Sequence, residues 1–158
     1  MGQPLSRQRT TLIQRWYRRL GQRCPRWVHS KMLLIMLGGA VGCYLRYAIS
    51  RWINQQPWGQ FFPFGTLVVN VVGCFILAVA AVIILEHLPP AHQDWYLLIG
   101  TGFCGGFTTF STFGWETYKL LRDGSWSYAV ANILGSCLAG LAAIMLAVTL
   151  TAMILPKK

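Results

Sequence analysis

Three long stretches of this sequence contain no charged residue, and most of their positions are apolar. They run from Trp52 to Leu85, from Trp95 to Trp115 and from Gly124 to Pro156. About 18 or more such residues form a helix that can cross a hydrocarbon core of about 30 Å, because an α-helix rises about 1.5 Å per residue. The pattern therefore predicts three transmembrane helices, over residues 62–85, 95–115 and 126–155.

A fourth transmembrane helix is predicted from Met32 to about Ile53. Its uncharged part covers only Met32 to Leu45, so this helix must carry Arg46 in its second half. A cleaved signal peptide is the alternative for an apolar stretch that follows a basic segment, but no small-residue cleavage site comes after it. We therefore expect an all-α membrane protein whose four-helix domain comprises residues 32–155.

Composition agrees with a bilayer as the solvent and separates the first part of the chain from the rest. Hydrophobic residues make up 54% of the sequence and charged residues 11%, a balance that would make a soluble domain of 158 residues poorly soluble.

Residues 1–31 contain eight Lys or Arg and no acid, which accounts for most of the net charge of +10. Leu12, Trp16 and Leu20 recur every four residues there. This basic N-terminal extension is thus either a surface helix attracted to anionic lipids or a disordered tail.

The reactive residue types show no pattern of an enzyme. The five cysteines stand singly, without the paired spacing of metal or redox motifs, and we expect inert thiols. The three histidines lie outside the predicted spans and form no HExxH arrangement. We predict that the protein is not an enzyme.

The third predicted span has an unusual middle, from Gly102 to Phe113. It contains three glycines and four hydroxyl side chains, so we expect the helix to break there. Irregular backbone at membrane depth persists only inside protein or beside a wet cavity, where its carbonyls and amides can serve ions. The alternative is a helix whose glycines allow close packing against a neighbour. The glycines alone do not decide between the two.

Polar residues in the other spans favour a pore. Asn70 lies in an otherwise apolar run and would be costly if it faced lipid, so it must face protein or water. Asn132 and Ser136 are four residues apart and can form a polar strip along one helix face. For either of these two residues taken singly, an interhelical hydrogen bond is the simpler interpretation.

Aromatic and basic residues near the predicted break also suit anions. Phe110 and Phe113 share a helix face, and the positive edges of their rings can favour an anion without the strong binding of a full cation, although most aromatics at such positions merely pack. Arg46 either attracts anions at a pore mouth or extends its charge to the membrane interface.

At these residues the sequence resembles the Fluc/CrcB family of fluoride channels, over nearly the whole of residues 32–155. The motifs that carry the resemblance are Gly38 to Gly42 with Arg46-Tyr47, Gly65 to Asn70 with Gly73, and Gly102 to Phe113. The last motif is long and hard to match by chance. Gly140 and Gly114 depart from the family pattern, in which serine often occupies these positions, and this affects the detail of the inner pathway rather than the family.

The resemblance implies a fluoride-selective passive channel that exports fluoride across the cell inner membrane. It also implies a dual-topology homodimer of two antiparallel copies, with a structural Na⁺ ion held by the backbone carbonyls of Gly105 and Thr108. The implied pore residues are Asn70, Phe110, Phe113, Ser136, Thr112 and Arg46, with Glu116 in a vestibule. The expected partners are a second copy of the chain, fluoride and the lipid bilayer, and not nucleic acid.

Two other classes of protein are compatible with four short membrane helices. A small proton-coupled multidrug antiporter needs a membrane-embedded carboxylate, and Glu116 is the only candidate in this sequence. A non-transporting membrane scaffold would carry no flux at all. Fluoride efflux from proteoliposomes separates the three classes.

The distribution of charge bears on membrane orientation. With four spans, residues 1–31, the loop 86–94 and the C-terminus share one side and carry ten Lys or Arg, against four on the other side. The positive-inside rule then favours a single orientation. Without residues 1–31 the count becomes two against four, which suits insertion in both orientations. We expect either that translation of the functional protein begins at Met32 or that the extension is tolerated and biases insertion.

Overall fold

The computed structural model describes residues 26–155, and almost all of the predicted basic extension lies outside them. The chain divides into two units, Met1–Ser30 and Lys31–Lys158, and the second unit contains the helical fold. Every regular element of the described residues is helical. Within residues 26–155, three helical stretches are apolar and long enough to cross a membrane: Ser30–Asn54, Phe64–His87 and Trp126–Ile154. The prediction of an all-α membrane protein is confirmed at this level.

The long stretches follow the apolar pattern of the sequence. They are α2 (Arg26–Asn54), α3 (Phe64–Ala81), which continues as the π-helical segment η2 (Val82–His87), and α7 (Trp126–Ile154). The short helices η1 (Pro57–Gly59) and η3 (Pro90–His92) lie in the connections. Each of them begins with a proline, because the missing N–H of proline costs no hydrogen bond at the start of a helix.

The segment predicted as the third span consists of several helical pieces. They are α4 (Asp94–Tyr96), the π-helical segment η4 (Leu97–Cys104), α5 (Gly105–Phe107) and α6 (Phe110–Arg122). Thr108 and Thr109, between α5 and α6, have extended backbone, with φ/ψ of −90°/160° and −152°/120°. The helical path is therefore interrupted for these two residues, directly after the cluster of glycines.

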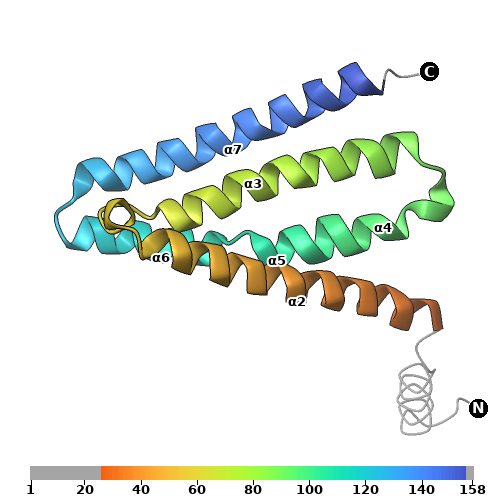
Figure 1. Ribbon diagram of the computed structural model, residues 1–158, viewed down its shortest axis with the longest axis horizontal. Coiled ribbons are helices and arrows are strands. Elements are labelled where there is room, and N and C mark those ends of the chain that lie inside the picture. Colours follow the sequence, from red (N-terminus) through yellow and green to blue (C-terminus); the bar gives the residue numbers. More distant parts are fainter. Residues whose placement is uncertain (1–25, 156–158) are drawn as a thin grey trace, which may run out of the picture. The chain divides into compact units, whose positions relative to one another are not determined.

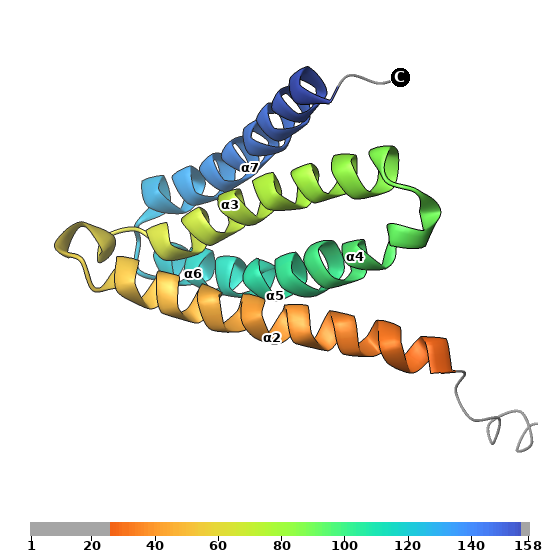
Figure 2. The same cartoon turned by 45° about the vertical axis from the view of Figure 1, so that its right-hand side comes forward.

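The long helical segments of the second unit lie side by side, and the chain reverses direction after α2, after α3–η2 and after α6, whereas α4 to α6 continue in one direction (Figure 1 and Figure 2). In both views α3 lies between α7 and the α4–α6 segment, which in turn lies next to α2. Buried small residues occur on both α3 and α7, among them Ala78, Ala129 and Ala147, and small residues let membrane helices approach closely. Large apolar side chains such as Met36 and Leu138 are exposed, as expected for a surface that lipid covers.

Glycines bring α2 into direct backbone contact with the α4–α6 segment. They lie four residues apart on each side of the contact, at Gly38 and Gly42 of α2 and at Gly102 and Gly106 of the facing segment. A Cβ atom at any of these positions would overlap a carbonyl oxygen of the other segment. The packing interpretation is therefore correct for Gly102 and Gly106, and the helical path is interrupted only after them, at Thr108 and Thr109.

Candidate functional site

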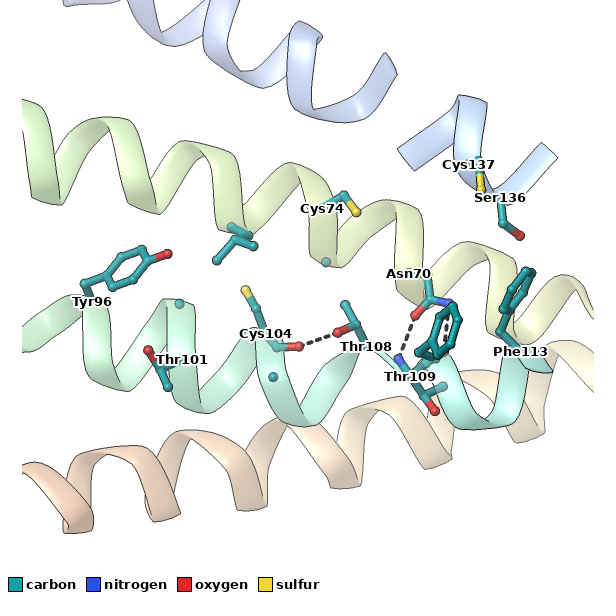
Figure 3. A pocket seen from close by; sticks show the side chains of 15 residues that line it. Asn70, Cys74, Tyr96, Thr101, Cys104, Thr108, Thr109, Phe113, Ser136 and Cys137 are labelled. Atoms are coloured by element: carbon teal, nitrogen blue, oxygen red, sulfur yellow. Dashed lines mark hydrogen bonds between the residues drawn. The ribbon is translucent and has the colours of Figure 1, made fainter. Parts of the chain in front are cut away.

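A pocket of about 540 Å³ opens beside the extended residues Thr108 and Thr109. Its lining includes four of the predicted pore residues and both predicted sodium ligands, namely Asn70, Phe110, Phe113, Ser136, Gly105 and Thr108. Figure 3 shows Asn70 of α3 and Phe113 of α6 close to the extended segment, with Ser136 approaching from α7. The structure thus brings these six residues together, whereas Thr112 and Arg46 are not part of the lining.

Asn70 holds the extended backbone in place. Its side-chain oxygen accepts a hydrogen bond from the Thr109 N–H at 2.7 Å, and its amide nitrogen donates to the Thr109 carbonyl at 3.1 Å. The Thr109 N–H loses its helical acceptor at the interruption, and the Asn70 side-chain oxygen takes that place. The Asn70 amide nitrogen adds a hydrogen bond to the Thr109 carbonyl, which as the N-cap carbonyl also accepts the first hydrogen bond of α6. A polar residue in the apolar run of α3 therefore faces protein, as its cost in lipid requires.

The interruption also releases two backbone carbonyls from helical hydrogen bonding. In a continuous α-helix, the Gly105 carbonyl would accept from the Thr109 N–H and the Thr108 carbonyl from the Thr112 N–H. Instead, the Thr109 N–H donates to Asn70, and the Thr112 N–H donates to the Thr109 hydroxyl at 3.2 Å. Backbone carbonyls released in this way are suitable ligands for a hard cation.

Phe110 and Phe113 form an aromatic pair at the start of α6. Their ring centroids are 5.7 Å apart and the rings are tilted by 39°. Phe110 is 84% exposed in the single chain, so its ring projects from the second unit rather than packing into it. This arrangement leaves ring edges, which carry partial positive charge, available at the pocket.

The predicted polar strip on α7 divides into two environments. Ser136 lines the pocket, but Asn132 is fully buried and donates a hydrogen bond to the Thr117 hydroxyl of α6 at 2.8 Å. The simpler interpretation, an interhelical hydrogen bond, is therefore correct for Asn132. The two residues stay connected, because the Ser136 hydroxyl lies 3.5 Å from the Asn132 side-chain oxygen.

Arg46 and Thr112 make contacts outside the pocket. The Arg46 Nε donates to the Gly106 carbonyl at 3.0 Å, and so joins α2 to α5 beside the glycine contact. This contact is one that neither sequence interpretation of Arg46 included. Thr112 interacts with the Thr109 hydroxyl through both its N–H and its own hydroxyl, within the first turn of α6.

Glu116 lies at a second cavity of about 400 Å³, lined also by Asn54, Gln60, Lys119 and Asp123. Its Oε2 atom is buried and has no hydrogen-bond partner among the described residues. Glu116 lies near the middle of α6, one turn after Phe113, and its role in a vestibule stays a prediction.

Sequence reasoning did not single out Thr109, which has two roles at the interruption. Asn70 holds its backbone, and its side chain caps α6 by accepting from the Thr112 N–H. Threonine directly before a helix start is a common N-cap, so the sequence carried a usable signal. The cysteines Cys74, Cys104 and Cys137 also line the pocket, which their single spacing in the sequence did not indicate.

These helices and this pocket define a multi-pass α-helical membrane protein with polar groups gathered at a helix interruption. Residues 33–148 match the family described as CrcB-like protein, Camphor Resistance (CrcB). The chain belongs to this family, and the resemblance seen in the motifs is confirmed.

Relatives of this chain carry the name Fluoride-specific ion channel FluC. The one from Serratia proteamaculans (strain 568) is 47% identical over 125 residues, which cover 75% of this chain and 94% of the relative. The one from Solibacter usitatus (strain Ellin6076) is 46% identical over 114 residues, with 72% and 92% covered. A third, from Chloroflexus aurantiacus, is 39% identical over 121 residues, with 77% and 94% covered. The chain therefore spans nearly the full length of each relative.

Proposed function

We propose that this protein is a fluoride-selective channel that lets fluoride leave the cell passively across the inner membrane. The observation that carries the proposal is the pocket in which two phenylalanine rings, the Asn70 amide and the Ser136 hydroxyl come together beside interrupted backbone. The names of the relatives supply the identity of the ion. In this role the protein performs no chemical reaction and is not an enzyme.

The chemistry of the pocket suits a small anion that must enter and leave quickly. The ring edges of Phe110 and Phe113 are weakly positive, and the Ser136 hydroxyl can donate a hydrogen bond, so together they replace part of a hydration shell. Among the described residues, the lining contains no Lys or Arg, whose full charge would hold an anion too tightly for conduction. Passive flux is consistent with a sequence that contains no nucleotide-binding motif.

We further propose that η4, α5 and α6 form one interrupted membrane span, the third of four. The segment lies beside α3 in both views of the fold, with α2 next to it. Extended backbone at membrane depth is compatible with lipid only if protein or water satisfies it, and Asn70 satisfies both backbone groups of Thr109. The interruption is thereby supported from α3.

A structural Na⁺ ion fits the two carbonyls released at the interruption. Gly105 and Thr108 would hold it, and the ion would neutralise the carbonyl oxygens that no helical N–H satisfies. Fluoride flux should therefore fall when sodium is removed during purification and replaced by N-methylglucamine, and should return when sodium is added. Potassium at the same ionic strength serves as the control for a general salt effect, and full activity without sodium would contradict this site.

An antiparallel second copy would complete the pocket. Phe110 is exposed, and a Cβ atom at Gly105, Gly114 or Gly135 would meet no atom within 4 Å. A polar lining that opened to lipid in this way would be costly, so we expect a second copy to cover it. Light scattering in detergent should give twice the mass of the 17.7 kDa chain, and Gly135→Trp, which fills the open face, should lower it to the monomer mass. A monomer with full flux would contradict the dimer.

The decisive test of function is efflux from proteoliposomes loaded with potassium fluoride, followed with a fluoride electrode after addition of a potassium ionophore. We expect rapid fluoride release without a proton gradient and negligible chloride release from matched vesicles. Flux that requires a proton gradient and is lost in Glu116→Gln would favour the antiporter alternative, and no flux would favour the scaffold. Chloride release at a rate comparable with fluoride would contradict selectivity.

A further inference from the structure

We infer that Asn132 is a positioning residue, which fixes the pocket residues Phe113 of α6 and Ser136 of α7 relative to each other. The inference rests on the proposed role of these two residues in fluoride conduction. Asn132 itself does not line the pocket and is fully buried between helices. It would therefore act on the ion pathway only through its neighbours.

On the α6 side, a chain of two hydrogen bonds connects Asn132 to the backbone of Phe113. The Asn132 amide nitrogen donates to the Thr117 hydroxyl at 2.8 Å, and this hydroxyl donates to the Phe113 carbonyl at 2.8 Å. The directions are fixed, because a carbonyl only accepts and the hydroxyl has a single proton to give. Thr117 therefore uses its proton on Phe113 and accepts from Asn132, so each bond polarises and strengthens the other.

On the α7 side, the same amide faces Ser136. Because the amide nitrogen is used by Thr117, the amide oxygen is directed to the Ser136 hydroxyl, one helical turn along α7. The separation of 3.5 Å is at the long limit for a hydrogen bond between these groups, so the bond is weak. When the pocket holds no anion, the Ser136 hydroxyl thus donates weakly to the Asn132 oxygen. An anion in the pocket can take over as acceptor at little cost in free energy.

Packing alone does not account for an amide at this position. The buried face of α7 is otherwise formed mainly by small residues, including Ala129, Ala143 and Ala147. A buried amide is costly unless its groups are hydrogen-bonded, and its bonds at this site both lead to residues at the pocket. The polar group therefore sets the register of α6 against α7 one turn beyond the phenylalanine pair.

The test uses fluoride efflux and thermal unfolding of the purified full-length protein. Thr117→Val removes the hydroxyl with almost no change of shape, Thr117→Ser keeps it, and Asn132→Leu removes the amide. Thr151→Val is the matched control, because Thr151 is a buried threonine of α7 that bonds only within its own helix, to the Ala147 carbonyl. We expect Thr117→Val and Asn132→Leu to lower flux by about tenfold or more, since misplacement of a site by about 1 Å can have effects of this size.

The remaining outcomes are specific to positioning. Thr117→Ser should keep most of the wild-type flux, and Thr151→Val should leave the flux near the wild-type rate. The double variant Thr117→Val/Asn132→Leu should conduct no more slowly than the slower of its two single variants, because both substitutions break the same chain of hydrogen bonds. Normal flux in Thr117→Val, or loss of flux that follows the melting temperature in all variants including Thr151→Val, would overturn the inference. If Asn132→Leu does not fold, the Thr117→Val and Thr117→Ser pair decides alone. Normal flux in Phe113→Ile would instead show that the proposed pore assignment is wrong.

Discussion

The glycine contact between α2 and the α4–α6 segment provides a matched pair of alanine substitutions on one helix. At Gly42, an added Cβ would overlap the Phe103 carbonyl oxygen and lie 2.8 Å from the Phe107 nitrogen. Both are backbone atoms that no rotamer change can move, so α2 itself must shift. At Gly39, on the same helix, the nearest atom to an added Cβ is the Gly102 carbonyl oxygen at 3.7 Å, an ordinary contact.

The difference in stability between the two variants isolates the packing cost. Alanine is favoured over glycine in a helix by up to about 1 kcal/mol, and this gain is common to Gly39→Ala and Gly42→Ala. It cancels in the comparison, which leaves the overpacking cost at Gly42, about 1–3 kcal/mol. The shift of α2 would also stretch the Arg46 hydrogen bond to the Gly106 carbonyl, now 3.0 Å long, so we expect the upper part of this range.

Equilibrium unfolding by SDS titration in mixed micelles measures this difference. We expect Gly39→Ala to unfold at the wild-type midpoint or above it, and Gly42→Ala at a clearly lower fraction of SDS. Fluoride efflux from the same preparations should fall only for Gly42→Ala, because α5 leads directly into the interruption. Equal midpoints for the two variants would refute the backbone contact between α2 and the α4–α6 segment.

Three further predictions concern the pocket and the basic extension. Asn70→Ala leaves the Thr109 N–H without a partner and removes one of the bonds to the Thr109 carbonyl, so efflux should fall and the unfolding free energy should decrease by about 1–3 kcal/mol; an unchanged midpoint would show that water replaces the amide. Phe110→Ile keeps a large apolar side chain but removes the ring edges, so it should lower fluoride efflux strongly with little change of the unfolding midpoint; normal efflux would count against the role of Phe110 in the pore. Deletion of residues 1–31 should preserve efflux and give cysteine-labelling signals for both orientations, and labelling of one orientation alone would contradict the antiparallel dimer.

The sequence predicted the apolar helices well because their signal is local. Long uncharged runs and the prolines between them mark α3–η2 and α7 to within a few residues of the observed ends. The polar residues of the pocket were also predictable, since Asn70 and Ser136 are expensive in lipid and must find partners or water. Each of these inferences needs only a residue and its immediate surroundings.

Features that depend on distant pairs were less accessible. Arg46 bonds a carbonyl 60 positions later in the chain, and no local pattern distinguishes this contact from a charge that reaches the interface. The motif from Gly102 to Phe113 predicted that the helix is interrupted, but not at which residue. Its glycines did not mark the place, because Gly102 and Gly106 pack against α2. The sequence placed Asn132 and Ser136 on one face of α7. It did not predict that Asn132 bonds Thr117, because this contact depends on the register of α6 against α7.

The two extended residues between α5 and α6 have an electrical consequence. Peptide dipoles add along a helix, so the end of a helix carries roughly half a negative charge and the start of a helix roughly half a positive one. Because only Thr108 and Thr109 separate the end of α5 from the start of α6, these opposite partial charges lie next to each other. The backbone thus presents a negative and a positive pole side by side within an apolar segment, with no net charge to carry into the bilayer.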